Sequence, residues 1–146
     1  MRTLTLPNET LLPEVVKLLL EEQTIALKAK GNSMLPFIIG DKDSVLLQKR
    51  EIVSIGNIVL AEIAPKLFVL HRIIKIKNDK ITLMGDGNLW ETEECTKENI
   101  SGQVIAIIRN GKAIDCNSKK EQRKVMIWKT LLPIRKYLLA IYRRIK

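Results

Sequence analysis

The chain has 146 residues, of which 46% are hydrophobic and 28% charged, and its formal net charge is +9 at pH 7. The length suits one domain with a real core, and the composition is that of a globular protein rather than a disordered or fibrous one. Two cysteines are too few for a disulfide scaffold, and one histidine excludes a multi-histidine metal site. We expect no metal and no other cofactor, and we expect Cys95 and Cys116 to be reduced and structural.

The start of the chain predicts no secretory signal, because prolines and acids interrupt residues 1–16 where a signal needs an apolar stretch. No window offers the ~20 apolar residues that cross a bilayer. We therefore expect a cytoplasmic protein that stays on the side of the membrane where it is made.

The first predicted element is a short helix over residues 13–22, because proline suits its first turn and apolar side chains cover one broad face. Short apolar runs typical of strands follow at residues 24–29, 44–47, 57–63, 66–76, 80–84 and 102–114. Turn residues at 77–80 and 109–112 predict hairpins, and Asn110-Gly111 is the stronger signal. The pattern predicts a small, mainly antiparallel β domain with one helix in front.

The net charge belongs to the end of the chain. Ten bases and one acid follow position 118, whereas residues 1–118 hold fifteen of each sign. Residues 117–123 are polar and predict a linker. Five apolar residues beyond Pro133 then recur at helical spacing on one side: Ile134, Tyr137, Leu138, Ile141 and Ile145. The bases lie mostly elsewhere around this helix: Arg135, Lys136, Arg143, Arg144 and Lys146. We expect one domain over residues 1–116, and a linker with a basic amphipathic helical tail over residues 117–146.

The tail predicts a membrane partner. Residues 125–146 combine the bases with Trp128, Tyr137, Tyr142 and several leucines and isoleucines. A nucleic-acid arm seldom needs so much apolar area, whereas a helix lying in a lipid interface requires it. We therefore expect peripheral binding to anionic membrane surfaces and no nucleic-acid partner. The alternative is that the apolar side packs on the β domain and leaves the bases solvated.

Three short motifs carry the candidate chemistry. Ser33 stands in a run of turn formers, Lys30-Gly31-Asn32-Ser33-Met34-Leu35-Pro36, and taken alone it reads as an ordinary turn serine. As a nucleophile it would need a positioned base, and His71 is the only imidazole. A lone histidine in a strand-like run is more often structural. Asp86 follows a β-type run among glycines, where an acid forms a simple turn or orients an imidazole.

Taken together and in this order, the motifs resemble those of type I signal peptidases and of the wider S24/S26-type serine peptidases, which include repressor-type self-cleaving proteins. They are Gly-x-Ser-Met-x-Pro at residues 31–36, His71-Arg72, and Gly-Asp-Gly-Asn at residues 85–88. The resemblance spans about residues 24–110. It implies a mainly β fold of signal-peptidase/LexA-like type.

The resemblance also implies site residues and a reaction. Ser33 matches the nucleophile, His71 the general base of the Ser-His branch, and Asp86 the acid of the glycine box. That branch also implicates a second acid downstream, for which the candidates are Glu91, Glu93 and Glu94. The reaction is acyl transfer on a peptide or precursor protein, with the backbone N–H groups at Ser33 and Gly31 facing the oxyanion.

The same resemblance suggests an extended substrate that pairs with a strand edge and carries small side chains next to the cut. Met34 and Phe37 would then line the pocket, unless they are plain core residues. We expect the Ser33 hydroxyl to lie within or slightly beyond hydrogen-bond reach of His71. We also expect Asp86 to approach the ring more closely than the glutamates do.

Two other functions stay open. One is a non-catalytic module of the same fold that docks through its basic tail. The other is a self-processing, repressor-like peptidase, although that branch uses a lysine base and carries a DNA-binding domain in front. Thirty residues with one helix cannot make a helix-turn-helix module. We expect no N-terminal membrane anchor, which would be a further departure from secretory signal peptidases.

Overall fold

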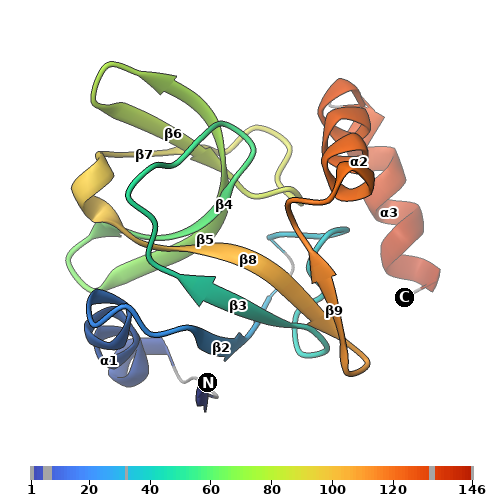
Figure 1. Cartoon of the computed structure of the whole chain (residues 1–146). Coiled ribbons are helices and arrows are strands. Elements are labelled where there is room, and N and C mark those ends of the chain that lie inside the picture. Colours follow the sequence, from blue (N-terminus) through green and yellow to red (C-terminus); the bar gives the residue numbers. More distant parts are fainter. Residues whose placement is uncertain (1, 5–7, 32, 132–133, 146) are drawn as a thin grey trace.

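The computed structural model describes the backbone of residues 2–4, 8–31, 33–131 and 134–145. Six residues used in the sequence interpretation lie outside those with described side chains: Asn32, Pro133, Arg143, Arg144, Ile145 and Lys146. The helices are α1 (Asn8–Leu20), α2 (Lys119–Thr130) and α3 (Arg135–Ile145), with a 3-10 turn η1 at Lys97–Asn99 (Figure 1). The strands are β1 (Arg2–Leu4), β2 (Ile25–Lys28), β3 (Ser44–Gln48), β4 (Ile58–Ala64), β5 (Leu67–Lys77), β6 (Lys80–Met84), β7 (Glu93–Cys95), β8 (Ile100–Arg109) and β9 (Lys112–Asp115).

Within the described residues these nine strands form one sheet in the order β1-β2-β3-β8-β4-β5-β6-β7, with β9 paired to β8. Every pairing is antiparallel except that of β1 with β2. Strand β3 shows why the pattern predicted strands, since its buried and half-buried residues alternate along the pleat. The mainly β fold predicted from the sequence is confirmed.

The predicted hairpins are present. Asn110 and Gly111 have positive φ angles of 52° and 76°, the backbone of a two-residue turn that matches the twist of the flanking strands.

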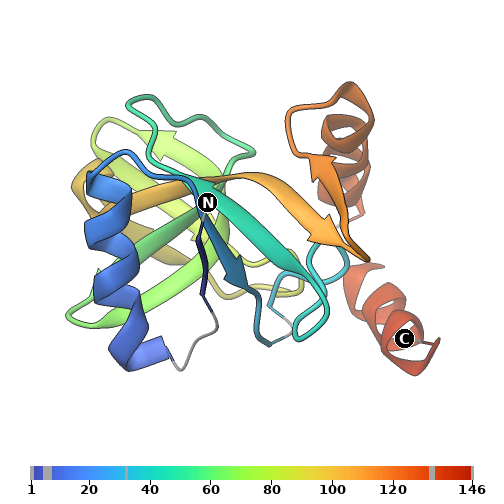
Figure 2. The same cartoon turned by 60° about the horizontal axis from the view of Figure 1, so that its bottom comes forward.

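Helix α1 covers one side of the sheet, and α2 and α3 lie on the other side of the molecule (Figure 2). Helix α1 begins at Asn8, five residues before the predicted start, so Pro13 lies inside the helix rather than in its first turn.

The expected linker at residues 117–123 is largely helical. Ser118 caps α2 by accepting a hydrogen bond from the Glu121 backbone N–H at 3.2 Å, and Glu121 pairs with Lys124 at 2.9 Å. Such a cap satisfies one of the free N–H groups at a helix start, so a polar segment of this kind begins a helix as readily as it forms a loop.

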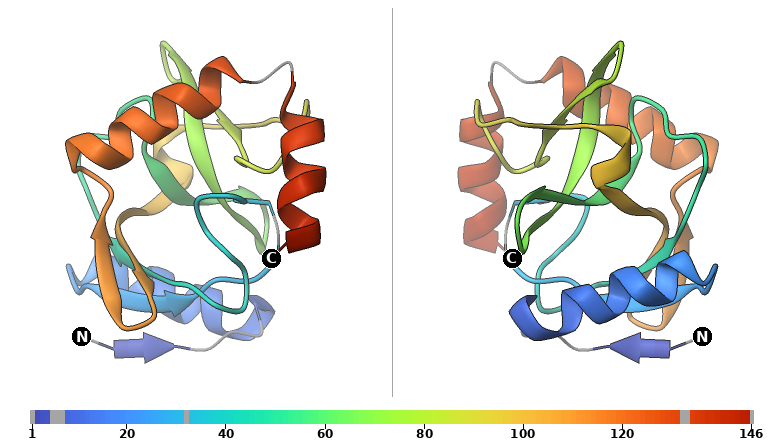
Figure 3. Two further views of the ribbon diagram at one scale, coloured as in Figure 1. Left: turned by 90° about the vertical axis from the view of Figure 1, so that its right-hand side faces the viewer. Right: turned by 90° about the vertical axis from the view of Figure 1, so that its left-hand side faces the viewer.

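The C-terminal helices pack against the β body, and α2 and α3 run in different directions across it (Figure 3). Trp128 and Leu139 are buried in a cluster with Leu35, against which Phe37 and Leu138 also pack. The expected apolar row therefore divides. Leu138 packs inward, whereas Tyr137 and Ile141 on α3, with Ile134 directly before it, form an exposed stripe. In the part of the chain that the structure describes, no helix is long and apolar enough to span a membrane.

Candidate active site

The loop that carries Ser33, residues 30–43, is held by a buried acid. Asp43 is fully buried and accepts hydrogen bonds from the Ile39 N–H at 2.8 Å and from Arg109 at 3.0 and 2.7 Å. Arg109 also donates to the Phe37 carbonyl at 3.0 Å, and its bond to Asp43 raises the pKa of the guanidinium. We call these residues the serine loop. The Asp43–Arg109 pair ties it to the end of β8, and sequence reasoning missed both residues.

The glycine turn at residues 85–88 packs against the serine loop. The Gly87 N–H donates to the Ser33 carbonyl at 2.7 Å, and the Asp86 N–H donates to the Met34 sulfur at 3.3 Å. A Cβ atom on Gly85 would collide with the Ser33 carbonyl and would lie 3.1 Å from Cδ2 of His71. Glycine is therefore required at position 85 by a close approach, and this turn joins the serine loop to the histidine.

The structure brings Ser33, His71, Gly31 and Met34 together. They line a cavity of about 190 Å³ between the end of β2, the serine loop and the first half of β5, which we call the serine cavity. Ser33 and His71 share this cavity without a hydrogen bond between their described side chains. Phe37 does not line it; its ring lies 5.0 Å from the Arg72 guanidinium instead.

The acid that contacts His71 is Glu93. Its Oε1 lies 2.6 Å from Nδ1 of the ring. A carboxylate only accepts, so Nδ1 carries the proton and Nε2 is left as the ring acceptor. Glu93 and Cys95 share a face of β7, and Cys95 is buried, so Glu93 points inward. Glu94 faces the other way and pairs with Lys80 at 3.5 Å, while Glu91 is exposed.

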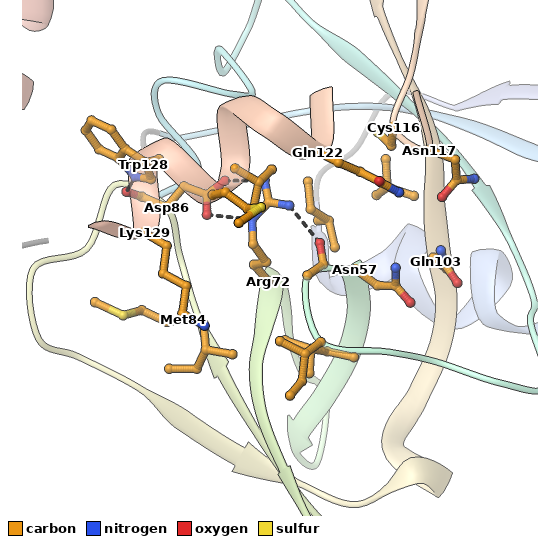
Figure 4. Close-up of a pocket in the computed structure, with 18 of the residues that line it drawn as sticks. Asn57, Arg72, Met84, Asp86, Gln103, Cys116, Asn117, Gln122, Trp128 and Lys129 are labelled. Carbon is orange, nitrogen blue, oxygen red and sulfur yellow. Dashed lines mark hydrogen bonds and ion pairs between the residues drawn. The ribbon is translucent and has the colours of Figure 1, made fainter. Parts of the chain in front are cut away.

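The expectation that Asp86 would lie nearest to His71 was wrong. Asp86 instead accepts from Nε and Nη2 of Arg72 at 2.8 and 2.6 Å, and Nη1 of Arg72 donates to the Gly56 carbonyl at 2.7 Å (Figure 4). Successive side chains of a strand point to opposite faces, so His71 and Arg72 on β5 cannot serve the same acid. The rigid guanidinium fork matches a carboxylate with two parallel bonds and holds Asp86 on its own face.

Sequence reasoning did not connect the tail to this turn. The indole Nε1 of Trp128 on α2 donates to the Asp86 carbonyl at 2.8 Å (Figure 4). Sequence reasoning also missed β7, because a run of glutamates without apolar periodicity does not look like a strand. The buried Cys95 two residues after Glu93 is the signal that favours Glu93 over its neighbours, once a strand is assumed.

The remaining candidate groups take no part in this cavity. Cys95 and Cys116 are both free. Burial raises the pKa of Cys116 to about 11. Burial and, to a smaller extent, the negative charge of Glu93 raise the pKa of Cys95. Among the described residues, no group of three His, Cys, Asp or Glu side chains is placed to hold a metal ion.

Comparison with known proteins agrees with the fold. A search of the curated proteins finds no match to this chain. The family model described as Peptidase S24-like matches residues 2–113, which include Ser33, His71, Asp86 and Glu93 and stop before α2. This match spans well over half of the chain, and strands β1 to β8 and the glycine turn lie within it. The chain therefore belongs to the Peptidase S24-like family.

Proposed function

We propose that the protein is a serine endopeptidase that cleaves a peptide or precursor protein, with Ser33 as nucleophile and His71 as general base. One observation carries this proposal: the serine lines the same cavity as the only imidazole, whose Nδ1 is held by Glu93 at 2.6 Å. That bond orients the ring and leaves Nε2 to accept a hydroxyl proton. Glu93, rather than Asp86, is the orienting acid in this proposal.

The reaction follows from these roles. The Ser33 oxygen attacks the peptide carbonyl carbon while Nε2 of His71 takes the hydroxyl proton. When the C–N bond breaks, the imidazolium returns that proton to the leaving amine, and an acyl ester remains on Ser33. Water then attacks the ester by the same route and restores the free serine. Glu93 stabilises the imidazolium in both halves of the cycle.

The oxyanion would lie beside the backbone of the serine loop. The backbone N–H of Ser33 is the first donor that we assign to this charge. Gly31 lines the same cavity, and its φ of +79° turns the chain in the left-handed region that favours glycine. Backbone donors of this kind stabilise the charge that develops on the carbonyl oxygen.

The sheet offers a place for an extended substrate. Strand β5 pairs with β4 from Leu67 onward, but it pairs with β6 only from Arg72. Residues 68–70 therefore have an open edge in the described sheet, and they line the serine cavity. A peptide adding to this edge would place its carbonyl beside Ser33. The small volume of the cavity favours small side chains next to the cut.

A fluorophosphonate probe with an intact-mass readout tests the reaction. We expect one adduct on Ser33, absent in Ser33→Ala and formed about 1,000-fold more slowly in His71→Gln. Ser54→Ala is the matched control, because Ser54 is exposed and lies outside the cavity. Failure of the chain to form an adduct with any such probe would favour the non-catalytic module. A fall in the mass of the chain on incubation alone would favour self-processing.

The exposed stripe of α3 supports a site of action at the membrane. Ile134, Tyr137 and Ile141 are 46%, 61% and 59% exposed, and they belong to a tail whose net charge is +9. Lys136 lies 4.9 Å from the Tyr137 ring, so a base accompanies the apolar side chains. We infer that this stripe rests on anionic bilayers, where each nearby base contributes about 1 kcal/mol.

Co-sedimentation with phosphatidylserine-containing vesicles tests the membrane role on the full chain. We expect salt-sensitive binding that the double variant Tyr137→Ser with Ile141→Ser loses. Ile52→Ser is the matched control, since Ile52 is 81% exposed and lies outside the tail. Equal pelleting of all three proteins, or binding that ignores lipid charge, would contradict the membrane role.

A further inference from the structure

A second and larger cavity lies on the other face of β5. It has a volume of about 430 Å³ and is bounded by α2 and by the strand face that carries Arg72 (Figure 4). We call it the α2 cavity. The proposed peptidase mechanism does not use it, although Asp86 lines it. Its volume falls within the ~300–1,000 Å³ typical of sites for small organic ligands.

The charged side chains that line the α2 cavity do not balance. Arg72, Lys129 and Arg135 are basic, and Asp86 is the one acid in the described lining. Because the charges of Arg72 and Asp86 neutralise each other in a pair with two hydrogen bonds, the positive charges of Lys129 and Arg135 remain without an opposite charge among the described lining residues. The cavity therefore presents a local charge of about +2, and low-dielectric walls strengthen such a field for an incoming anion.

Arg135 is the less usual of these two bases. It is only 6% exposed, its Nε and Nη2 donate to the Trp128 carbonyl at 3.3 and 3.2 Å, and it lies 5.0 Å from the Trp128 ring. No carboxylate within the described residues forms an ion pair with it. Burial lowers the pKa of this guanidinium, and the nearby Asp86 only partly opposes that effect. A buried charge without an opposite charge is costly, so an anion beside Arg135 would be stabilising.

The uncharged part of the lining combines the amide side chains of Asn57, Gln103, Asn117 and Gln122 with several apolar side chains. Ile58 and Val104 form part of the inner wall, and Met84 is buried there as well. Ile55 and Met126 line the same cavity and are 55% and 70% exposed. These exposed apolar side chains would be covered by a ligand with an apolar body. A bare inorganic anion would leave them in water.

We propose that the α2 cavity binds a small amphipathic organic anion, a carboxylate with an aliphatic body, whose head lies at Arg135 and Lys129 and whose tail covers Ile55 and Met126. The site is separate from the serine cavity. It adjoins the glycine turn at residues 85–88 through Asp86. A bound ligand would therefore contact a residue whose backbone N–H donates to Met34 of the serine loop.

Calorimetric titration of the full chain with sodium octanoate tests this proposal. We expect saturable binding to one site, and about tenfold weaker binding of 1-octanol and of inorganic phosphate, each of which lacks one half of the ligand. Arg135→Gln should weaken octanoate binding about tenfold or more, since it removes the buried partner of the carboxylate.

Two exposed positions keep the test independent of folding. Met126→Glu places a repelling carboxylate at the rim and should abolish binding, and Lys129→Gln should weaken it about threefold. Lys112→Gln is the matched control, because Lys112 is exposed on β9 and does not line the cavity. The proposal is overturned if octanoate gives no saturable binding, if octanol or phosphate binds as well as octanoate, or if Met126→Glu and Lys129→Gln bind like the control.

Discussion

The two faces of β5 carry two acid–base pairs of opposite character. On one face, His71 and Glu93 meet through one bond, the glutamate side chain keeps 18% exposure, and the imidazole borders the serine cavity. On the other face, Arg72 and Asp86 are 9% and 5% exposed and meet through two bonds, with a third from Arg72 to the main chain.

This contrast shows which of the two pairs suits proton transfer. The pair at the cavity leaves one ring nitrogen free to accept a proton. In the buried pair, both carboxylate oxygens of Asp86 accept hydrogen bonds from Arg72, so this pair holds the turn at residues 85–88. An acid in a family motif is thus assigned by the face it occupies, not by its place in the motif alone.

The largest expected effect is on stability. Asp86→Asn leaves the Arg72 charge buried without an opposite charge, so we expect a loss of about 3–5 kcal/mol in the free energy of unfolding. Urea denaturation measures it. Glu94→Gln is the control, since the Glu94–Lys80 pair is exposed and should contribute less than about 1 kcal/mol. An Asp86→Asn protein that is stable but inactive would return the orienting role to Asp86.

Glu93→Gln should show the opposite pattern. We expect adduct formation at Ser33 to slow about 100-fold, or about 2.7 kcal/mol in the barrier, because the amide no longer stabilises the imidazolium. The free energy of unfolding should fall by only about 1 kcal/mol, because the amide oxygen of glutamine can still accept the hydrogen bond from Nδ1. Probe kinetics and urea denaturation on one preparation separate the two quantities. A large stability loss with unchanged kinetics would make this pair structural as well.

A smaller effect is expected where α2 meets the buried pair. Trp128→Phe keeps an aromatic ring but removes the donor to the Asp86 carbonyl, so we expect a loss of about 1 kcal/mol in unfolding free energy. Trp90→Phe is the matched control, since Trp90 is 76% exposed. Equal stability of the two variants would mean that α2 does not brace the turn.

The smallest expected effect is a change in a cysteine pKa. Glu93 contributes to the raised pKa of Cys95, so Glu93→Gln should lower that pKa, because the thiolate no longer meets a neighbouring negative charge. Cys116 lies on the other face and should still titrate at about 11. Carbon-13 labelling at the cysteine Cβ atoms follows both in one titration. A parallel change at both cysteines would show that the two faces are not separate.

Much of the architecture was predictable because it depends on local pattern. Alternating apolar residues and turn residues such as Asn110-Gly111 predicted the main strands and hairpins, and the family motifs identified Ser33 and His71 as candidates. The tail was harder. Its helical periodicity was visible, but which part of the apolar side packs inward depends on contacts with Leu35 and Phe37, far away in the sequence.

The amino-acid pattern alone was enough to predict the mainly β class, the concentration of charge in the tail, and the identity of the only imidazole. The pairing of His71 with Glu93 and of Arg72 with Asp86 could be seen only in the folded sheet. The physical reason is that neighbouring residues of a strand face opposite ways, and the acid each one meets comes from a distant segment. The strand that carries Glu93 forms by pairing with β6, and that pairing is a property of the folded sheet rather than of the local residues.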